Sequence, residues 1–331
     1  MNKTISAFIM AMVLGLSAIG QTAVHAEAAS APAAATPAAA NAPAPAAASN
    51  AAAAPAYVHL KPTKDIGMPR DGGVYFQQQF TPNGHYAYWM HTAILMPIIT
   101  IISLFVLGLL LWAMVRYSRR MNPQASRTSH NTFIEIVWTL VPVLILIGIA
   151  IPSIDLLAKQ FKPAPKGSVV VKVTGYQWYW GYEYPDNGIP EYVSNVLPPE
   201  KAKANGEPVL LGVDNRMVLP VGVPIKLIIT GSDVIHSFSV PAFWVKEDAV
   251  PGRLNERTFT IEKPGVYYGV CSELCGDRHG FMPIAVEAVP PEKFAQWVHS
   301  QGGKMPGEAA AAAPAAAPSN AAAPAAAPAK S

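Results

Sequence analysis

The sequence predicts a two-helix transmembrane hairpin joined to an all-β domain that lies outside the cytoplasm. Residues 92–115 contain no charged residue, and residues 136–154 are uncharged between Glu135 and Asp155. About 20 apolar residues are enough for a helix to cross the hydrocarbon core of a bilayer. Residues 168–289 instead contain short β-branched and aromatic runs separated by Gly, Pro, Asn and Asp. This second pattern is typical of a β-sandwich or β-barrel.

Residues 1–26 have the pattern of a secretory signal peptide. Lys3 precedes an apolar run at residues 7–16, and small residues follow up to an A-x-A-like cleavage site at Val24-His25-Ala26. The alternative interpretation is a first membrane anchor. In both cases the residues that follow lie outside the cytoplasm.

Two segments rich in alanine and proline flank the rest of the chain. We interpret residues 27–71 as a periplasmic tether and residues 301–331 as a disordered tail. The frequent prolines interrupt helices, and the tracts offer few apolar side chains to bury. We therefore expect both segments to be extended and solvated.

The predicted hairpin occupies residues 72–162, with spans at about 92–115 and 136–156. The loop between the spans contains no acidic residue and four arginines, which are Arg116, Arg119, Arg120 and Arg127. The positive-inside rule places this loop in the cytoplasm. Both the N-terminal tether and the chain after the second span are then periplasmic, in agreement with the signal peptide.

The charge of the chain is unevenly distributed. The whole chain has a formal charge of +3, but residues 163–300 contain more acidic than basic residues. Without a basic patch on the periplasmic part, nucleic-acid binding is excluded as a function. A mildly acidic exposed domain instead suits a basic partner that arrives by diffusion.

The predicted β domain covers residues 163–300. Its expected strands are the alternating or β-branched runs at 169–173, 178–184, 208–213, 224–230, 255–261, 265–270 and 283–289. Residues 291–298 predict one closing helix with Phe294, Trp297 and Val298 on its apolar face.

A short segment of the β domain concentrates possible metal ligands. Cys271, Cys275, His279 and Met282 lie within it, and the two cysteines are the only ones in the chain. Thiolate, thioether and imidazole are ligands that suit copper. The segment follows an apolar run, so we expect it to be a loop between strands. His236, upstream in the chain, could complete the ligand set.

Other interpretations of this segment stay open on the residues alone. Two cysteines in an oxidising compartment are often bonded to each other. Two cysteines and two histidines can also hold structural zinc. A mononuclear blue-copper site uses two His, one Cys and a weak Met, whereas this chain offers one thiolate more. Two bridging thiolates would accommodate a pair of coppers that share one charge.

Several other segments join this loop in a wider pattern. They are EIVWTLVP at 135–142, QWYWGYEY at 177–184, VDNRMVLP at 213–220, DVIHS at 233–237, PGRLN at 251–255 and the loop at 271–282. In these segments and in their order, the chain resembles subunit II of the haem–copper cytochrome c oxidases. The resemblance extends from about Gly72 to Val298.

The resemblance implies a cupredoxin-like Greek-key barrel that carries a binuclear copper centre, CuA. Carried over to this chain, it implies that Cys271 and Cys275 bridge both coppers. His236 and His279 would each bind one copper, and Met282 would be a weak ligand to one of them.

The resemblance also implies roles for three further residues. The backbone carbonyl of Glu273 would bind the second copper, and its side chain would share a magnesium or manganese ion with subunit I. Trp178 would receive electrons from cytochrome c, although a half-buried strand aromatic or a membrane-interface anchor is the simpler interpretation. Glu135 would form the entrance of a proton path, although an acid at a helix N-terminus also stabilises the helix dipole.

Three acids occupy positions at which the family docks the lysines of cytochrome c. They are Glu183, Asp214 and Asp233. The simpler interpretation is solvated surface charge, with Asp214 paired to Arg216 or to another base.

We therefore expect subunit II of a proton-pumping terminal oxidase in a bacterial inner membrane, working with subunits I and III. It would pass electrons from cytochrome c to haem in subunit I, where oxygen is reduced to water. The chain has no Cys-x-x-Cys-His motif, so the donor would be a separate cytochrome. The alternatives are a quinol oxidase subunit II without copper, a copper chaperone or thiol–disulfide protein, and a nitrous-oxide-reducing enzyme, which needs a further catalytic domain.

Overall fold

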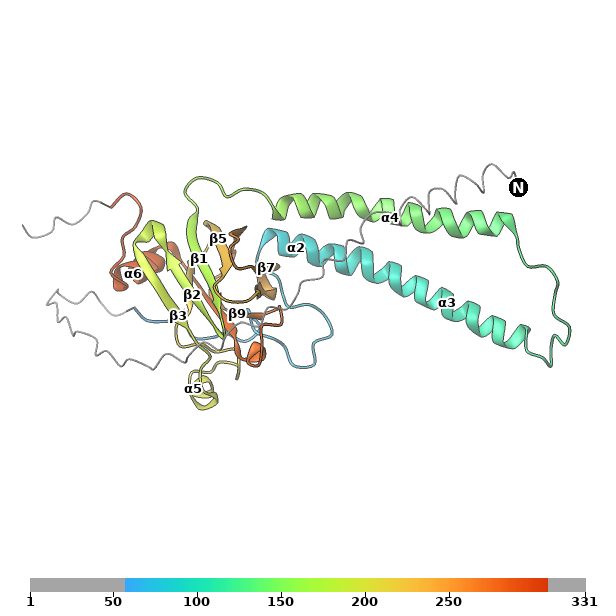
Figure 1. The fold of residues 1–331 in the computed structure, drawn as a ribbon, viewed down its shortest axis with the longest axis horizontal. Coiled ribbons are helices and arrows are strands. Elements are labelled where there is room, and N and C mark those ends of the chain that lie inside the picture. Colours follow the sequence, from blue (N-terminus) through green and yellow to red (C-terminus); the bar gives the residue numbers. More distant parts are fainter. Residues whose placement is uncertain (1–56, 309–331) are drawn as a thin grey trace, which may run out of the picture. The chain divides into compact units, whose positions relative to one another are not determined.

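The structure, a computed structural model, describes residues 57–308. The predicted signal peptide and most of both Ala/Pro-rich segments lie outside the described residues. The described part contains two long helices and ten β-strands (Figure 1).

The hairpin is built from two long apolar helices. Thr81 caps the first, because its hydroxyl accepts a hydrogen bond from the backbone N–H of Gly84 at 3.1 Å. Asn131 caps the second in the same way through Ile134. The first helix runs continuously through α2 (Pro82–Trp89), a π-helical turn (Met90–Leu95) and α3 (Met96–Arg116), and the second is α4 (Thr132–Gln160). A long apolar helix covers each predicted span and extends beyond its predicted bounds.

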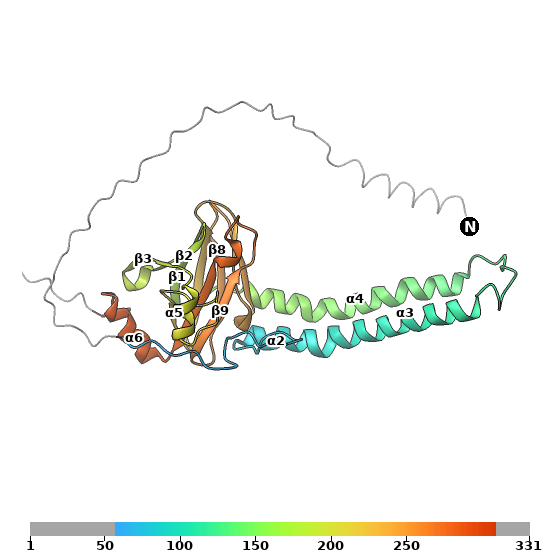
Figure 2. The same cartoon turned by 90° about the horizontal axis from the view of Figure 1, so that it is seen from below.

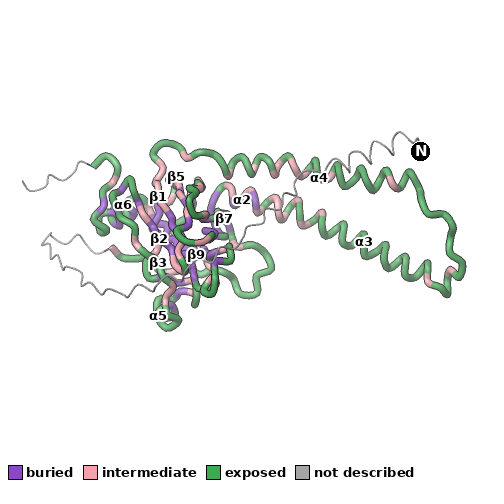
Figure 3. The backbone as a smooth tube through the Cα atoms, viewed as in Figure 1, coloured by how far each residue is buried: buried purple, intermediate pink, exposed green. Residues whose placement is uncertain are grey.

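No residue of α3 or α4 is buried, and most of their side chains are exposed (Figure 3). α3 is apolar on all sides and contains no buried residue. A helix of this kind is stable only where lipid or other protein surrounds it. α2 lies against α4, and in Figure 1 α3 diverges from α4 toward the loop that joins them, although the two helices overlap in the view of Figure 2.

The β domain consists of two five-stranded sheets. One has the order β3-β2-β1-β5-β8, and the other has the order β4-β10-β9-β6-β7. β1 pairs in parallel with β5, and β10 pairs in parallel with β4. The strands are β1 (Val169–Tyr176), β2 (Tyr179–Tyr184), β3 (Ile189–Ser194), β4 (Met217–Pro220), β5 (Pro224–Gly231), β6 (His236–Val240), β7 (Val245–Ala249), β8 (Asn255–Thr260), β9 (Gly265–Cys271) and β10 (Pro283–Val289).

Side chains from both sheets meet in one core. Trp180 and Leu227 from the first sheet belong to the same buried cluster as Phe238 and Val286 from the second. This two-layer arrangement confirms the predicted cupredoxin-like domain. The expected closing helix is also present as α6 (Pro291–Ser300), with Phe294, Trp297 and Val298 buried.

One predicted strand is wrong. Residues 208–213 form a turn in which Leu210 has a φ of 70°, a left-handed conformation that a strand cannot contain. Within this stretch, Val213 makes an isolated β-bridge to Val196. The neighbouring short helix α5 (Pro199–Ala204) has no counterpart among the predicted elements.

The β domain is larger than predicted at both of its ends. Residues 57–68, placed in the solvated tether by composition, lie against β9 and β10, and Leu60 and Met68 pack against the small buried cluster that contains Tyr268. Beyond residue 300, the backbone N–H of Lys304 donates to the carbonyl of Asn187 at 2.9 Å. Both segments carry apolar side chains that the Ala/Pro tracts lack, so they can pack.

Candidate metal centre

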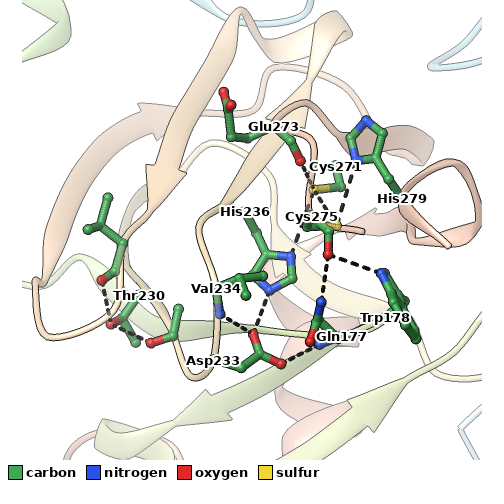
Figure 4. A network of polar contacts seen from close by, with 12 residues as sticks. Gln177, Trp178, Thr230, Asp233, Val234, His236, Cys271, Glu273, Cys275 and His279 are labelled. Atoms are coloured by element: carbon green, nitrogen blue, oxygen red, sulfur yellow. Dashed lines mark hydrogen bonds and ion pairs between the residues drawn. The ribbon is translucent and has the colours of Figure 1, made fainter. Parts of the chain in front are cut away.

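The pairing of strands brings distant possible ligands together. Cys271 ends β9, and Phe238 of β6 lies opposite it in the sheet. His236, at the start of β6, therefore reaches the loop that joins β9 to β10. The turn between β1 and β2 approaches the same loop from the other sheet, as Figure 4 shows.

Two thiols and two imidazoles form the centre of the site. The Sγ atoms of Cys271 and Cys275 are 3.9 Å apart, and both cysteines are free and buried. His236 Nδ1 lies 4.0 Å from Cys271 Sγ, and His279 Nδ1 lies 3.6 Å from Cys275 Sγ. The ligand atoms of His236, Cys271 and Cys275 all lie within 4.8 Å of one another. Metal bonds to sulfur and nitrogen are about 2.0–2.3 Å long, so these spacings fit shared metal ions.

The two remaining predicted ligands lie at the two ends of the same loop. The carbonyl oxygen of Glu273 is 3.3 Å from Cys271 Sγ, whereas its exposed carboxylate points away from the thiols (Figure 4). Met282 is 1% exposed, and its carbonyl accepts a hydrogen bond from the backbone N–H of Cys271 at 3.2 Å. This bond closes the base of the loop at the start of β10.

The pKa values of the two thiols are shifted in opposite directions. Burial raises the pKa of the Cys271 thiol, but hydrogen bonds from His236 and the backbone of Ser237 bring it down to about 6. Burial and the neighbouring charge of Cys271 raise the pKa of the Cys275 thiol. One sulfur therefore ionises readily and the other resists. A metal ion bound by both sulfurs would supply positive charge that stabilises the second thiolate.

Asp233, predicted to dock a partner, is a direct neighbour of the ligand His236. Its Oδ1 lies 2.8 Å from His236 Nε2, and its Oδ2 accepts a hydrogen bond from the backbone N–H of Gln177 at 2.7 Å. Burial raises the pKa of Asp233, but the hydrogen bonds from His236 and the backbone more than offset this and lower it. Such a carboxylate fixes the orientation of a metal-binding imidazole. The spacing of three residues between Asp233 and His236 is the signal from which this role could have been predicted.

Gly175 makes room for the same imidazole. A Cβ atom at this position would lie 2.7 Å from His236 Cδ2, a distance that real side chains do not show. The glycine therefore allows the histidine ring to lie close to β1.

Trp178 contacts the ligand loop directly. Its indole Nε1 donates to the carbonyl of Cys275 at 3.2 Å, and the Gln177 side-chain amide donates to the same oxygen at 2.8 Å. The next residue, Gly276, has a φ of +118°, and a Cβ there would lie 3.1 Å from both donor side chains. Glycine is therefore needed for this close approach. The structure brings Trp178 to the site; Gln177 was absent from the predicted residues.

The other predicted residues lie outside this site. Glu183 pairs with Lys172 at 3.0 Å across β1 and β2. Asp214 accepts hydrogen bonds from the backbone N–H groups of Asn195 and Asn215, both at 2.7 Å, and it does not pair with Arg216. In the first turn of α4, Glu135 Oε1 accepts a hydrogen bond from the backbone N–H of Asn131 at 3.2 Å.

A group of buried charges that the sequence did not reveal lies elsewhere in the β domain. Arg216 binds Glu207, and its Nη1 lies 3.1 Å from Glu287 Oε2. Glu287 also accepts hydrogen bonds from the hydroxyl of Tyr57 at 2.8 Å and lies 2.7 Å from His59 Nδ1. We call these five residues the buried charge cluster. It joins the N-terminal segment to β10.

The fold and the site define a membrane-anchored protein whose cupredoxin-like domain carries a cysteine–histidine cluster able to hold metal. Residues 169–289 match the family model described as cytochrome c oxidase subunit II, periplasmic domain. Residues 69–156 match the model described as cytochrome c oxidase subunit II, transmembrane domain.

Two related sequences agree with these matches, and one solved structure is also similar in sequence. The chain is 48% identical over 207 residues to the probable cytochrome c oxidase subunit 2 of Rickettsia bellii, covering 62% of this chain and 76% of that protein. It is 42% identical over 254 residues to cytochrome c oxidase subunit 2 of Cereibacter sphaeroides, covering 72% and 83% respectively. The crystal structure of the periplasmic domain of subunit II of cytochrome oxidase from Bradyrhizobium japonicum is 51% identical, with a TM-score of 0.39, and covers 42% of this chain and 97% of that one.

The chain belongs to the cytochrome c oxidase subunit II family. It is accordingly a component of the oxidase complex, and its two long helices are apolar enough to anchor it in a membrane. Within this family, the cluster of His236, Cys271 and Cys275 indicates a copper site.

Proposed function

We propose that this chain accepts electrons from cytochrome c at a binuclear CuA centre and passes them to haem in subunit I, where oxygen is reduced to water. One observation carries this proposal. Two free, buried thiols lie 3.9 Å apart, and each has an imidazole nitrogen within 4.0 Å. A mononuclear blue-copper site needs only one of these thiolates.

Five side chains would hold the metal. Cys271 and Cys275 would bridge, His236 and His279 would each bind from one side, and Met282 would be a weak ligand. A copper pair bound there supplies reversible one-electron oxidation and reduction. The sulfur and imidazole donors suit copper better than they suit hard cations such as magnesium.

Glu273 would take part through two different groups. Its carbonyl lies beside Cys271 Sγ and would complete the copper ligands. Its carboxylate is exposed and points away from the thiols, so it is free to share a magnesium or manganese ion with subunit I.

Electrons would arrive through Trp178. In support, its indole is only half-buried and donates directly to the carbonyl of Cys275. Glu183, Asp214 and Asp233 would attract the basic face of cytochrome c, and Asp233 would also orient His236. Such charges speed association and make it sensitive to salt more than they add affinity.

The hairpin would anchor the chain in a bacterial inner membrane, with the β domain in the periplasm. The exposed apolar surfaces of α3 and α4 would pack against lipid and against subunits I and III. Glu135, an ionisable residue at the start of a membrane span, would form the entrance of a proton path into subunit I. The complex would be a proton-pumping oxidase.

Cys275→Ser tests the copper proposal in the purified oxidase. We expect the wild-type complex to give an electron paramagnetic resonance spectrum of one unpaired electron shared by two equivalent coppers. The variant should lose this signal and the oxidation of cytochrome c, because a serine hydroxyl is a poor bridge between soft metal ions.

The amount of chain in the membrane and the haem spectrum of the complex serve as controls. A single-copper signal in the wild-type complex, or normal turnover in the variant, would contradict the proposal. A disulfide between the cysteines in the active complex would instead favour a thiol–disulfide function.

A further inference from the structure

Gln177 connects two parts of the metal site through two different groups. Its backbone N–H donates to Asp233 Oδ2 at 2.7 Å, and its side-chain amide donates to the carbonyl of Cys275 at 2.8 Å. Asp233 in turn lies 2.8 Å from the imidazole of His236 (Figure 4). Gln177 therefore contacts both the carboxylate that orients one ligand and the loop that carries the others.

The carbonyl of Cys275 receives two hydrogen bonds from neighbouring residues. Gln177 Nε2 donates at 2.8 Å and Trp178 Nε1 donates at 3.2 Å. A carbonyl oxygen has two lone pairs, so both are used. Because one hydrogen bond lets a loop pivot about the acceptor and two do not, the pair of donors fixes the orientation of the loop at Cys275.

The shape of the loop agrees with this arrangement. Gly276, the residue after Cys275, has a positive φ, and a Cβ atom at this position would crowd the side chains of Gln177 and Trp178. On the far side of this point, the loop is held by its own bonds, from the backbone N–H of His279 to Gly276 and from that of Phe281 to Arg278. Within the described residues 57–308, Gln177 and Trp178 are the only residues whose side chains donate to the Cys275 carbonyl.

We propose that Gln177 is a positioning residue that holds the Cys275 carbonyl against the Trp178 indole and so fixes the path by which electrons reach the metal. This proposal rests on the proposed function, in which electrons arrive at Trp178. The Trp178 bond is the longer of the two, so Gln177 contributes the better-formed contact. Because rates of electron transfer fall steeply with separation, a loop that pivots at Cys275 transfers electrons more slowly on average.

Gln177→Met in the intact oxidase tests the proposal. Methionine keeps the length of the side chain but has no N–H donor, and the backbone bond to Asp233 remains. Loss of one neutral hydrogen bond should raise the rate of hydrogen exchange at the amides of His279 and Phe281 by about 2- to 12-fold. Electron transfer within the preformed complex with cytochrome c should slow severalfold, and kcat should fall with KM unchanged.

Gln296→Met is the matched control, because Gln296 is exposed on α6 away from the site. It should change neither exchange nor kinetics. A raised KM with an unchanged rate inside the complex would make Gln177 a docking residue and overturn the proposal. Unchanged exchange at the loop, or a loss of bound copper, would overturn it as well.

Failure of the proposed function itself has a different signature. If Trp178→Phe left electron transfer within the complex unchanged, the electron path through Trp178 would be wrong. Hydrogen exchange at the loop in Gln177→Met would still report whether Gln177 holds the Cys275 carbonyl, because that measurement does not depend on electron transfer.

Discussion

Replacing Arg216 with methionine should strongly destabilise the β domain. The arginine side chain is 10% exposed and lies between the carboxylates of Glu207 and Glu287, which are 1% and 0% exposed. Its Nη1 also donates to the carbonyl of Leu60 at 2.7 Å. Methionine fills similar space but leaves both carboxylates without this cation.

The size of the effect follows from the burial of the pair. Two unit charges about 3 Å apart interact by roughly 5 kcal/mol at an effective dielectric constant of about 20. Removing one partner of a buried ion pair costs about 3–5 kcal/mol, because the other charge stays desolvated. Glu287 keeps its bonds to His59 and Tyr57, so Glu207 should account for most of the loss.

Urea unfolding of the full-length chain in detergent, followed by tryptophan fluorescence, measures this loss. Trp180 and Trp297 are buried in the β domain and report its unfolding. Arg70→Met is the matched control, because the pair of Arg70 with Asp65 at 3.1 Å is exposed. Its removal should change the free energy of unfolding by only about 0–1 kcal/mol.

A second replacement separates charge from packing. Adding Glu207→Gln to Arg216→Met removes the uncompensated carboxylate, so part of the lost stability should return. If Arg216→Met cost no more than Arg70→Met, or if the added Glu207→Gln lowered stability further, the reasoning from buried charge would be refuted.

Two further predictions concern the metal site and acid stability. Gly175→Ala should displace the His236 ring, because the new Cβ would lie 2.7 Å from it. Electron paramagnetic resonance should then show loss or change of the copper signal. An unchanged spectrum would contradict this prediction and mean that β1 moves to accommodate the methyl group. Burial raises the pKa of Glu287, but hydrogen bonds from His59 and the backbone of Leu60 more than offset this and lower it from its ordinary 4.5. A carboxylate with a lowered pKa stabilises the folded state. The contribution of Glu287 is therefore present above pH 4.5 and is lost as the pH falls through the lowered folded-state pKa. Urea unfolding between pH 6 and pH 3 should show this decline, and Glu287→Gln should reduce its slope; an equal slope in both proteins would contradict the assignment.

Features encoded by local composition could be predicted from the sequence. The two membrane spans can be predicted by counting consecutive uncharged, apolar residues. Strands such as β5 can be predicted because residues suited to burial alternate along them with residues suited to a partly exposed face. The ligand loop could be recognised because Cys271, Cys275, His279 and Met282 are close in the chain and chemically distinctive.

Features that depend on distant contacts could not be predicted in this way. In the sequence, Asp233 has only the charge expected of a docking residue. Its hydrogen bond from Gln177, 56 residues away, forms because the fold brings the β1–β2 turn close to it. The contact of Gln177 with Cys275 joins residues 98 apart. The turn at Leu210 resembles a strand in the sequence because its residues are apolar, and composition does not reveal the positive φ of Leu210.

The bond between the backbone N–H of Leu60 and Glu287 closes a loop of 227 residues that includes both membrane spans. The N-terminal segment leaves the ribosome long before β10, so this part of the domain can be completed only after the last strand has crossed the membrane. A free chain would lose considerable entropy on closing so large a loop. Two spans return the chain to the side from which it started and shorten the search for its partner. The hairpin thus assists the folding of the domain as well as anchoring it.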